Sequence, residues 1–310
     1  MNFKSFLDFV EIKTKVASFI PFLLGTLFAL NRFGTIKPLN TLFFFISLIT
    51  LDMATTAINH YEGFRKGEDF NPLEERDIPK GLAAALILFL LAVSVVTGLL
   101  LVLRTDFIVL FIGIVSMGIA ILYSFGPVPI SGTPYGEVVS GGLMGFVIFF
   151  VALYIQVFDG GFFLFTLDGE ILSATINLKE FFAIFLVSLP LVFMIANIML
   201  ANNICDLDSD RERGRYTLPH YLGRKASVNL WVSLYGLTYL VIVFSVFMKL
   251  LPLVSLLILI SLIPNWGFIR QFREKQDKRQ TFVSSIKVFL TISGLWILSF
   301  ILQKIIKEFL

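Results

Sequence analysis

The chain has 310 residues, of which 57% are hydrophobic and only 15% are charged, and its net charge is +3. Soluble domains carry about 25% charged residues, so most of this chain cannot be a water-facing surface. The small net charge excludes a basic nucleic-acid-binding chain, a single Cys excludes an internal disulfide or a Cys-rich metal site, and His60 and His220 are too far apart to form a His-pair motif.

The first apolar segment lies near 16–31, and the acidic residues Asp8 and Glu11 precede it. A signal peptide begins with basic residues, so we expect a spanning helix here instead. A helix needs about 20 apolar residues to cross the hydrocarbon core, and backbone amides in lipid must be paired within the helix. Nine spans are predicted, near 16–31, 40–58, 82–103, 107–123, 138–158, 181–201, 228–248, 251–268 and 285–303.

The connections between these spans differ in their content of Lys and Arg. The rich ones precede span one and follow spans two, six and eight, so with nine spans they all lie on one side. The positive-inside rule makes that side cytoplasmic, with the N-terminus inside and the connection near 159–180 outside. We therefore expect an all-α integral membrane protein of the cell membrane, with a single domain over 1–310.

A motif follows span six, with the sequence NNICDLDSDRERGRYTLPHYLGRKAS from Asn202. Asn202, Asp206 and Asp210 are spaced i, i+4 and i+8, which places them on one stripe of a helix. Carboxylate and amide oxygens suit Mg²⁺, which completes its shell with water and phosphate oxygens. The adjacent Arg211, Arg213 and Arg215 could bind phosphate by bidentate hydrogen bonds.

A second, less regular motif follows span two, with the sequence NHYEGFRKGEDFNPLEERDIPKG from Asn59. Asn59 and Glu62 are i and i+3, Asp69 lies seven residues further, and Lys66 lies between the acids. A charged run of this kind is ordinarily a solvated loop. Two Asn-led motifs, four spans apart and so on one predicted face, favour a pair of Mg²⁺-diphosphate platforms instead.

A diphosphate at the membrane surface with its apolar tail among the spans indicates prenyl transfer. Mg²⁺ would neutralise the diphosphate and assist its departure. An electron-rich aromatic ring is the natural partner for the allylic cation, and apolar walls would shield that cation from water.

The two motifs together resemble the UbiA superfamily of membrane prenyltransferases over nearly the whole chain. The stretch NNICDLDSDRERGRYTLPHYLG is similar to that of the branch that prenylates 1,4-dihydroxy-2-naphthoate in menaquinone synthesis. The segments YSFGPVPISGTPYGEVVSGGLMG at 123–145 and EIKTKVASFIPFLLG at 11–25 are also similar to segments of the family. The resemblance implies a nine-helix fold and Mg²⁺-dependent transfer from polyprenyl diphosphate to dihydroxynaphthoate, giving demethylmenaquinone.

The same resemblance assigns roles to residues of this chain. The catalytic metal-diphosphate residues would be Asn59, Glu62, Asp69, Asn202, Asp206 and Asp210. The diphosphate contacts would be Lys66, Arg211 and either Lys13 or Lys15. The residues near the acceptor or the start of the prenyl chain would be Tyr123, Ser124 and Glu137. Tyr123 could instead be an interfacial aromatic residue, and Glu137 a solvated helix start.

The chain departs from the menaquinone branch at two places. Asn59-His60-Tyr61-Glu62-Gly63 stands where Asn-Asp-Tyr-x-Asp is usual, and Cys205 stands where an Arg is common. These changes fit either a shifted acceptor preference or a paralogue that serves a separate quinone pool.

Other functions are compatible with parts of this pattern. Within the superfamily, the acceptor could be 4-hydroxybenzoate, homogentisate or haem. A transporter or lipid-binding protein without catalysis is the alternative of another class, but transporter sites lie near the bilayer midplane. Asp52 is the acid nearest to mid-span, and its simplest role is a polar contact inside the bundle.

Overall fold

The computed structural model describes residues 3–65, 73, 78–126, 128–160, 162–168 and 170–309. Within these ranges, nine helical segments are long and apolar enough to cross a membrane, which confirms the expected number. They are Ile12–Phe33, Pro38–Arg65, Lys80–Val102, Phe107–Ser124, Gly136–Val157, Leu178–Cys205, Arg224–Phe247, Leu253–Glu274 and Val283–Phe309. The chain is therefore an all-α, multi-pass membrane protein.

The chain divides into two compact units. The first comprises Met1–Ile20 and Lys37–Ser131, and the second comprises Pro21–Ile36 and Gly132–Leu310. The boundary falls inside helix α2 (Val16–Phe33), at a proline that lacks the N–H for a helical hydrogen bond. The expectation of one domain over the whole chain stays a prediction.

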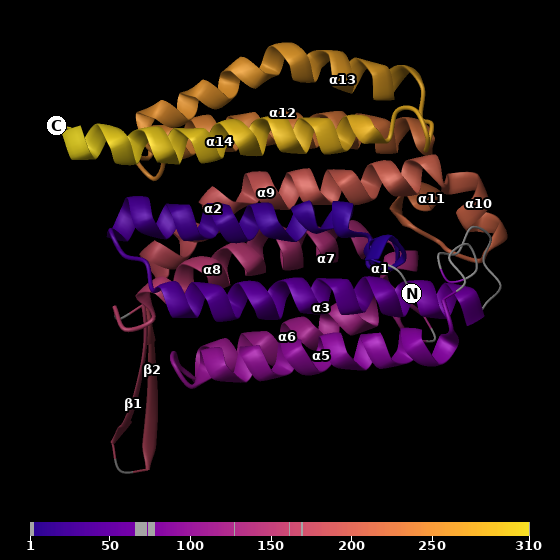
Figure 1. The fold of residues 1–310 in the computed structure, drawn as a ribbon. Coiled ribbons are helices and arrows are strands. Elements are labelled where there is room, and N and C mark those ends of the chain that lie inside the picture. Colours follow the sequence, from indigo (N-terminus) through magenta and orange to yellow (C-terminus); the bar gives the residue numbers. More distant parts are fainter. Residues whose placement is uncertain are drawn as a thin grey trace. The chain divides into compact units, whose positions relative to one another are not determined.

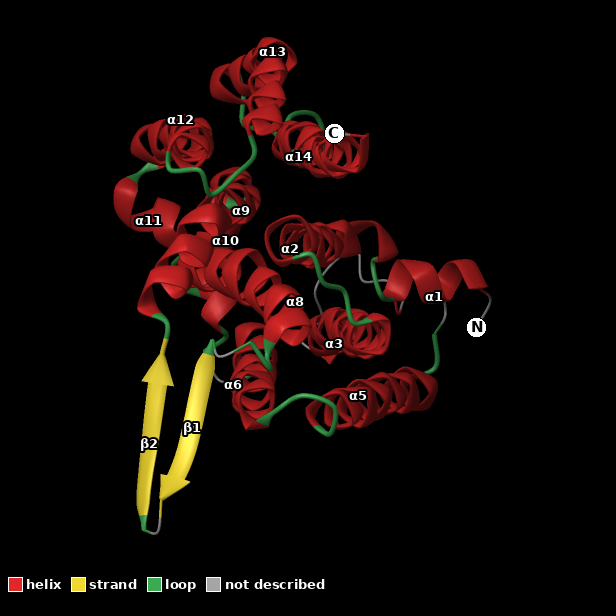
Figure 2. Cartoon of the chain, turned by 90° about the vertical axis from the view of Figure 1, so that its left-hand side faces the viewer, coloured by secondary structure: helices red, strands yellow, loops and turns green. Residues whose placement is uncertain are grey.

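The first unit is built around two long helices that pack along each other. Its elements are α1 (Phe3–Phe9), η1 (Ile12–Lys15), α3 (Pro38–Arg65), α5 (Lys80–Val102) and α6 (Phe107–Ser124). Helix α3 packs along α5, and α6 contacts both (Figure 2). Ser47 Oγ and Ser94 Oγ each donate to the other residue's carbonyl over 2.9 Å, because small residues let the two helices approach closely.

A buried ion pair joins the end of η1 to the middle of α3 inside the first unit. Lys15 Nζ lies 2.7 Å from Asp52 Oδ1 and 2.6 Å from Thr56 Oγ1, and Ser18 Oγ donates to Asp52 Oδ2. The Lys15 side chain is only 5% exposed. Asp52 thus makes the polar contact inside the bundle that its sequence position predicts.

The second unit surrounds the long helix α9 (Leu178–Cys205), which packs against helices on several sides (Figure 1). Its other elements are α7 (Gly136–Ser140), η3 (Gly141–Val147), α8 (Ile148–Val157), β1 (Phe163–Asp168), β2 (Ile171–Ile176), α10 (Leu207–Glu212), α11 (Leu218–Leu222), α12 (Arg224–Phe247), η4 (Leu253–Ser261), α13 (Leu262–Glu274) and α14 (Val283–Phe309). Helix α9 contacts η3, α7, α12 and α14, and α14 in turn contacts η4 and α13. The acidic motif after Asn202 is thereby attached to the best-packed helix of this unit.

Two glycines bring η3 directly against the backbone of α9. A Cβ on Gly141 would lie 2.7 Å from Val192 O, and one on Gly145 would lie 2.6 Å from Val192 Cα. Neither distance is possible for a real side chain, so only glycine permits this approach. The seven residues of η3 form a π-helix, a rare form that is frequent at functional sites.

The connection near 159–180 contains a β-hairpin, whereas its sequence is predicted to form an external loop. Strands β1 and β2 are antiparallel, and Asp168 pairs with Ile171 (Figure 1). A Gly-x pair between two runs of β-branched and aromatic residues is a known hairpin signal.

The eighth span changes its helical form along its length. It starts after Pro252 as a 3₁₀-helix, η4, and continues as the α-helix α13. Pro264 lies in the first turn of α13, where its missing N–H costs no hydrogen bond within the α-helix. Pro252 therefore marks the start of this span, and Pro264 lies within it at a position that a helix tolerates.

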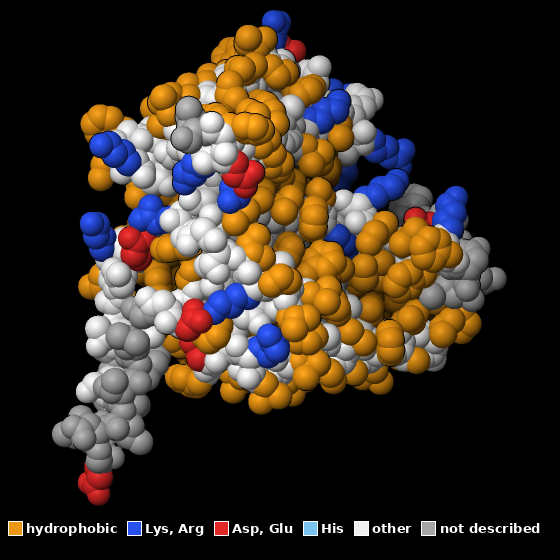
Figure 3. All heavy atoms as spheres, turned by 60° about the vertical axis from the view of Figure 1, so that its left-hand side comes forward, with side chains coloured by type: hydrophobic (Ala, Val, Ile, Leu, Met, Phe, Trp, Pro, Cys, Tyr) orange, Lys and Arg blue, Asp and Glu red, His pale blue; other side chains and the backbone are white. Residues whose placement is uncertain are grey.

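Apolar side chains cover much of the surface. Figure 3 shows hydrophobic atoms spread over most of the face that it draws, with charged side chains scattered between them. In α5, Leu88 and Phe89 are 67% and 64% exposed. Exposed apolar residues in this number suit contact with lipid chains rather than with water.

Candidate active site

The motif at the end of α9 keeps its helical spacing through a break in the helix. Helix α9 ends at Cys205 and α10 begins at Leu207. The N–H of Asp206 still donates to Asn202 O over 3.0 Å, and the N–H of Asp210 donates to Asp206 O over 2.7 Å. The three residues therefore lie on consecutive turns, as the i, i+4, i+8 spacing predicts.

A lysine from another connection lies between the first two residues of this stripe. Lys278 Nζ donates to both Asn202 Oδ1 and Asp206 Oδ2. The same ammonium lies 5.5 Å from the centre of the Phe282 ring. An amide oxygen and a carboxylate oxygen thus converge on one cation.

The position of Lys278 is set by a tight turn between α13 and α14. Asp277 Oδ1 accepts from the N–H groups of Arg279 and Gln280, each over 2.9 Å, and the Asp277 N–H donates to Thr281 Oγ1 over 2.9 Å. The N–H of Gln280, and then that of Arg279, hold the pKa of the Asp277 carboxyl below its ordinary value. Because this carboxylate anchors the turn, it fixes the backbone from which Lys278 reaches the motif.

Asp210, the third residue of the stripe, is paired with a different cation, Arg215. Asp210 is buried, and its Oδ1 lies 3.2 Å from Arg215 Nε. Its Oδ2 is also buried and has no hydrogen-bond partner among the residues that the structure describes. Burial raises the pKa of the Asp210 carboxyl above its ordinary value, and the Arg215 guanidinium opposes that rise.

The oxygens of the stripe have the chemistry of a Mg²⁺ site. In the described part of the chain, no three His, Cys, Asp or Glu side chains lie close enough together to hold a metal ion. Asn202 and Asp206 nevertheless share one cation, Lys278, and Asp210 has an unpartnered oxygen. Oxygen ligands completed by water and phosphate are what Mg²⁺ uses, so this donor set fits it.

Two glycines allow the chain to turn after α10 and again before α12. Gly214 has φ 68° after α10, and Gly223 has φ 77° before α12. Both values lie in the left-handed region that favours glycine after a helix. Between them, the N–H of Tyr216 donates to Gly132 O over 3.0 Å, which attaches the motif loop to the segment that precedes α7.

A second buried carboxylate contacts the residue next to Asn202. Asn203 Nδ2 donates to Glu137 Oε1 over 2.9 Å, and Glu137 is 3% exposed. The other Glu137 oxygen is buried and has no hydrogen-bond partner within the described ranges. Glu137 is therefore not the solvated helix start that the sequence left open.

The remaining charged residues of the motif lie on its outer side. Arg211 is exposed, which leaves its guanidinium accessible to a phosphate. Asp208 is exposed and pairs with Arg224 over 2.9 Å, on a different face from the stripe. Arg215, which the sequence groups with Arg211 as a phosphate ligand, is paired with Asp210 instead.

The first motif lies in the other unit, at the end of α3. The helix continues through Gly63 to Arg65, so Asn59 and Glu62 keep their helical spacing. Asn59 is exposed, and Glu62 Oε1 accepts from Arg65 Nη1 over 2.8 Å. Lys66 and Asp69 lie outside the described residues.

His60, the unusual residue of the first motif, contacts the N-terminal segment. Its Nδ1 lies 2.9 Å from Phe9 O, and its Nε2 lies 3.1 Å from Glu11 Oε1. Its two ring nitrogens therefore connect α3 to the end of α1 and to Glu11, the residue before η1.

The other predicted site residues of the first unit differ in exposure. Lys13 is exposed in η1, whereas Lys15 is buried in the ion pair with Asp52. Tyr123 and Ser124 are partly exposed at the end of α6. Of the two candidate lysines, only Lys13 is accessible to a substrate without breaking a buried contact.

The UbiA prenyltransferase family model matches residues 18–291, which include both motifs and Lys278. The chain belongs to the UbiA prenyltransferase family. A relative from Bacillus subtilis (strain 168), 1,4-dihydroxy-2-naphthoate octaprenyltransferase, is 28% identical over 237 residues, which cover 74% of this chain and 70% of the relative. The family and the relative support the sequence-level resemblance to the menaquinone branch.

Solved structures of the family share the fold. A UbiA homologue from Archaeoglobus fulgidus bound to GPP and Mg²⁺ matches with a TM-score of 0.67 and 14% identity over 96% of this chain and 99% of that one. The apo structure of a UbiA homologue from Aeropyrum pernix K1 matches with a TM-score of 0.65 and 18% identity over 93% and 98%. This UbiA-type prenyltransferase thus has the fold of its family.

Proposed function

We propose that this enzyme transfers a polyprenyl group from polyprenyl diphosphate to 1,4-dihydroxy-2-naphthoate, with release of diphosphate and loss of the carboxyl group as CO₂, giving demethylmenaquinol, the hydroquinone form of demethylmenaquinone. The observation that carries the proposal is the convergence of Asn202 and Asp206 on one cation at the end of an apolar spanning helix. The naphthoate-specific name of the Bacillus subtilis relative favours this acceptor over 4-hydroxybenzoate, homogentisate or haem.

Asn202, Asp206 and Asp210 would hold Mg²⁺ together with the diphosphate oxygens, and Asn59, Glu62 and Asp69 would do so at the first motif. When bound, Mg²⁺ supplies charge neutralisation that helps the diphosphate leave. The Mg²⁺ in the Archaeoglobus fulgidus homologue supports this dependence for the family.

Cationic side chains of the chain would bind the diphosphate itself. Arg211 is exposed beside the stripe, and Lys278 already contacts its oxygens. Lys278 also supplies a positive charge beside Asp206, where Cys205 leaves the neighbouring position uncharged. At the first motif, Lys66 and Lys13 are the proposed diphosphate contacts.

Glu137 would orient the aromatic acceptor. A buried carboxylate oxygen without a hydrogen-bond partner is costly, and a phenolic hydroxyl of dihydroxynaphthoate would satisfy it. Its contact with Asn203 would place that hydroxyl next to Asn202. Tyr123 and Ser124 would contact the acceptor or the start of the prenyl chain.

The placement of the basic connections supports a cytoplasmic N-terminus in the cell membrane, with both motifs on the cytoplasmic face. Polyprenyl diphosphates keep their head group at such a surface.

The test uses the purified full chain with Mg²⁺, labelled polyprenyl diphosphates of several lengths, and the four acceptors. Mass spectrometry should detect a prenylated naphthoquinone that disappears with EDTA. If a product forms only with one of the other three acceptors, dihydroxynaphthoate is not the acceptor. Ion flux in liposomes without any prenylated product would favour a transporter.

A further inference from the structure

A pocket of about 550 Å³ lies in the second unit, far from the acidic motif. One of its residues, Arg32, pairs with Glu180 in the first turn of α9, whereas the motif begins at Asn202 near the end of that helix. At 1.5 Å per residue the two sites are roughly 33 Å apart along α9. The pocket therefore belongs to the opposite membrane face.

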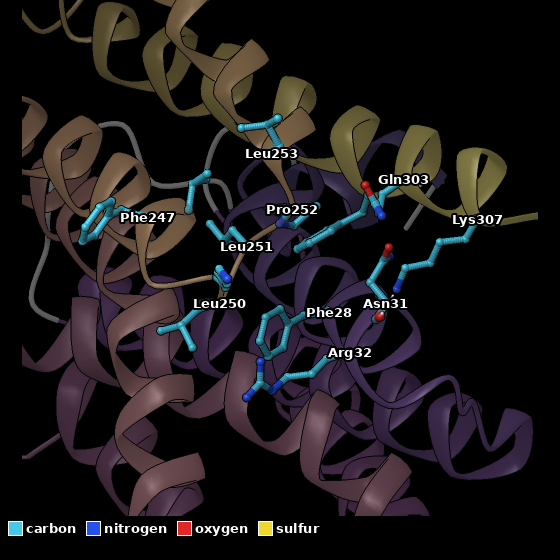
Figure 4. Close-up of a pocket in the computed structure, with 13 residues that line it drawn as sticks. Phe28, Asn31, Arg32, Phe247, Leu250, Leu251, Pro252, Leu253, Gln303 and Lys307 are labelled. Carbon is cyan, nitrogen blue, oxygen red and sulfur yellow. Dashed lines mark hydrogen bonds between the residues drawn. The ribbon is translucent and has the colours of Figure 1, made fainter. Parts of the chain in front are cut away.

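The pocket is lined by the ends of three helices and by the connection after α12 (Figure 4). Its lining comprises Phe28, Asn31, Arg32, Val246, Phe247, Lys249, Leu250, Leu251, Pro252, Leu253, Phe300, Gln303 and Lys307.

The charges of this lining are positive. Arg32 is compensated by Glu180, with hydrogen bonds of 2.9 and 3.0 Å. Lys307 extends toward Asn31 and donates to its carbonyl over 3.0 Å (Figure 4). Lys249 is exposed, and no described residue forms an ion pair or side-chain hydrogen bond with it. Two ammonium groups thus face the pocket without a carboxylate.

Lys249 occupies a backbone position at which glycine is usual. Its φ is 57°, its N–H donates to Val246 O, and the next N–H, of Leu250, donates to Ser245 O, each over 2.9 Å. This is the common helix-ending motif with a left-handed residue, which disfavours a side chain. Glycine would adopt this left-handed conformation with less strain, so the conformation of the turn does not explain why a lysine is present.

The surroundings of these cations are apolar. Phe28 and Phe300 are fully buried at the pocket, whereas Phe247 and Leu253 are 79% and 74% exposed beside it. The buried Asn31 Oδ1 has no hydrogen-bond donor within the described chain. A ligand that suits these features has an anionic group for the lysines, a hydroxyl for Asn31 and alkyl chains for the apolar rim.

We propose that this pocket binds the head group of an anionic phospholipid. The phosphate would accept from Lys249 and Lys307, and the acyl chains would lie against Phe247 and Leu253. Basic residues at the C-terminal ends of helices can also stabilise the helix dipole. That role does not require two lysines to line one pocket, nor a lysine at a backbone position that favours glycine. The site is independent of the prenyl-transfer chemistry.

The test is native mass spectrometry of the full chain after exchange of its lipids for phosphatidylglycerol or phosphatidylcholine with the same acyl chains. We expect phosphatidylglycerol to bind at least about tenfold more tightly: both lipids present a phosphate, but the choline ammonium of phosphatidylcholine repels Lys249 and Lys307, whereas the glycerol of phosphatidylglycerol offers a hydroxyl to Asn31. The variant K249G/K307Q should lose this preference. The control K304Q removes a charge from the same helix at a residue that pairs with Glu308 and does not line the pocket, and it should keep the preference.

Equal binding of the two lipids, or an unchanged preference in K249G/K307Q, would overturn the proposal. Displacement of phosphatidylglycerol by excess inorganic phosphate would also overturn it, because the site would then recognise a free ion. Elution as a single species and an unchanged Tm in phosphatidylcholine verify that each variant is folded. K249G alone, whose backbone suits glycine, provides the test if the double variant fails to fold.

Discussion

Lys278 places its ammonium against the carboxylate of Asp206, which lies 72 positions earlier in the chain. The same group contacts Asn202, so one cation already lies between two oxygens of the stripe. A metal ion bound by both oxygens would occupy the position of the Lys278 ammonium and would therefore displace it. We therefore expect Lys278 to move toward the diphosphate when the metal binds.

Replacing Lys278 should reveal this exchange. In Lys278→Ala, the apparent affinity for Mg²⁺ should rise by about tenfold, because a charge-assisted contact no longer competes with the metal. The KM for polyprenyl diphosphate should rise at the same time, because a cationic contact is lost. The measurement is turnover as a function of Mg²⁺ and of diphosphate. Arg279→Ala, at the neighbouring residue, should change neither constant, and weaker Mg²⁺ binding in Lys278→Ala would contradict the exchange.

Asp206 and Asp208 form a matched pair for testing the metal role. Asp206 lies on the stripe, whereas Asp208 is exposed on another face. Asp206→Asn should lower kcat/KM at least about a hundredfold, because it removes a charge that holds the metal. Asp208→Asn should leave turnover within about twofold of the wild type. Equal activities of the two variants would contradict the assignment.

Arg215 tests whether Asp210 needs its partner for stability. Arg215→Ala leaves a buried carboxylate uncompensated, but the arginine is 38% exposed, so a loss of about 1–2 kcal/mol is expected. Asp210→Asn in the same chain should recover part of it, since an amide needs no counter-ion. Thermal unfolding in detergent measures both. An unchanged Tm with a raised KM for the diphosphate would instead indicate that Arg215 binds phosphate.

The two candidate lysines near the first helix should behave differently. Lys15→Met leaves Asp52 without its buried partner and should cost about 2–4 kcal/mol of unfolding free energy. Lys13→Met should leave the Tm unchanged and raise the KM for the diphosphate several-fold, since Lys13 is the exposed residue. Thermal unfolding and steady-state kinetics separate the two roles, and the opposite pattern would exclude Lys13 as the diphosphate contact.

Glu137→Gln tests the acceptor role. The glutamine oxygen can still accept from Asn203, so the fold should persist. The KM for dihydroxynaphthoate should rise about tenfold while that for the diphosphate stays constant, because only the charged contact to a hydroxyl is lost. Tyr135→Phe, an exposed neighbour, is the control. If only the KM for the diphosphate changed, Glu137 would contact the diphosphate substrate and not the acceptor.

The spans and the helical stripe could be predicted from the sequence because both depend on local physics. A bilayer requires about 20 apolar residues with paired backbone amides, so hydropathy alone locates the nine helices. The stripe follows from the helical period of Asn202, Asp206 and Asp210.

What could not be predicted depends on contacts between residues far apart in the chain. The sequence shows Lys278 as one basic residue among several in its connection, and nothing local indicates that it reaches Asp206. The pairing of Asp210 with Arg215 competes with the phosphate role that the arginine cluster predicts. The hairpin was missed although Gly169-Glu170 between two β-prone runs was a readable signal.

The contact of Gly141 and Gly145 with Val192 has a consequence for the hydrocarbon tail of the donor. At this place the backbones of η3 and α9 are too close for even a methyl group to enter, and a long isoprenoid chain is far thicker than a methyl group. That seam is therefore sealed against the tail, which would have to pass elsewhere. Chain-length selectivity should accordingly respond to bulky substitutions along other seams, whereas this glycine pair acts as a fixed wall of the enzyme.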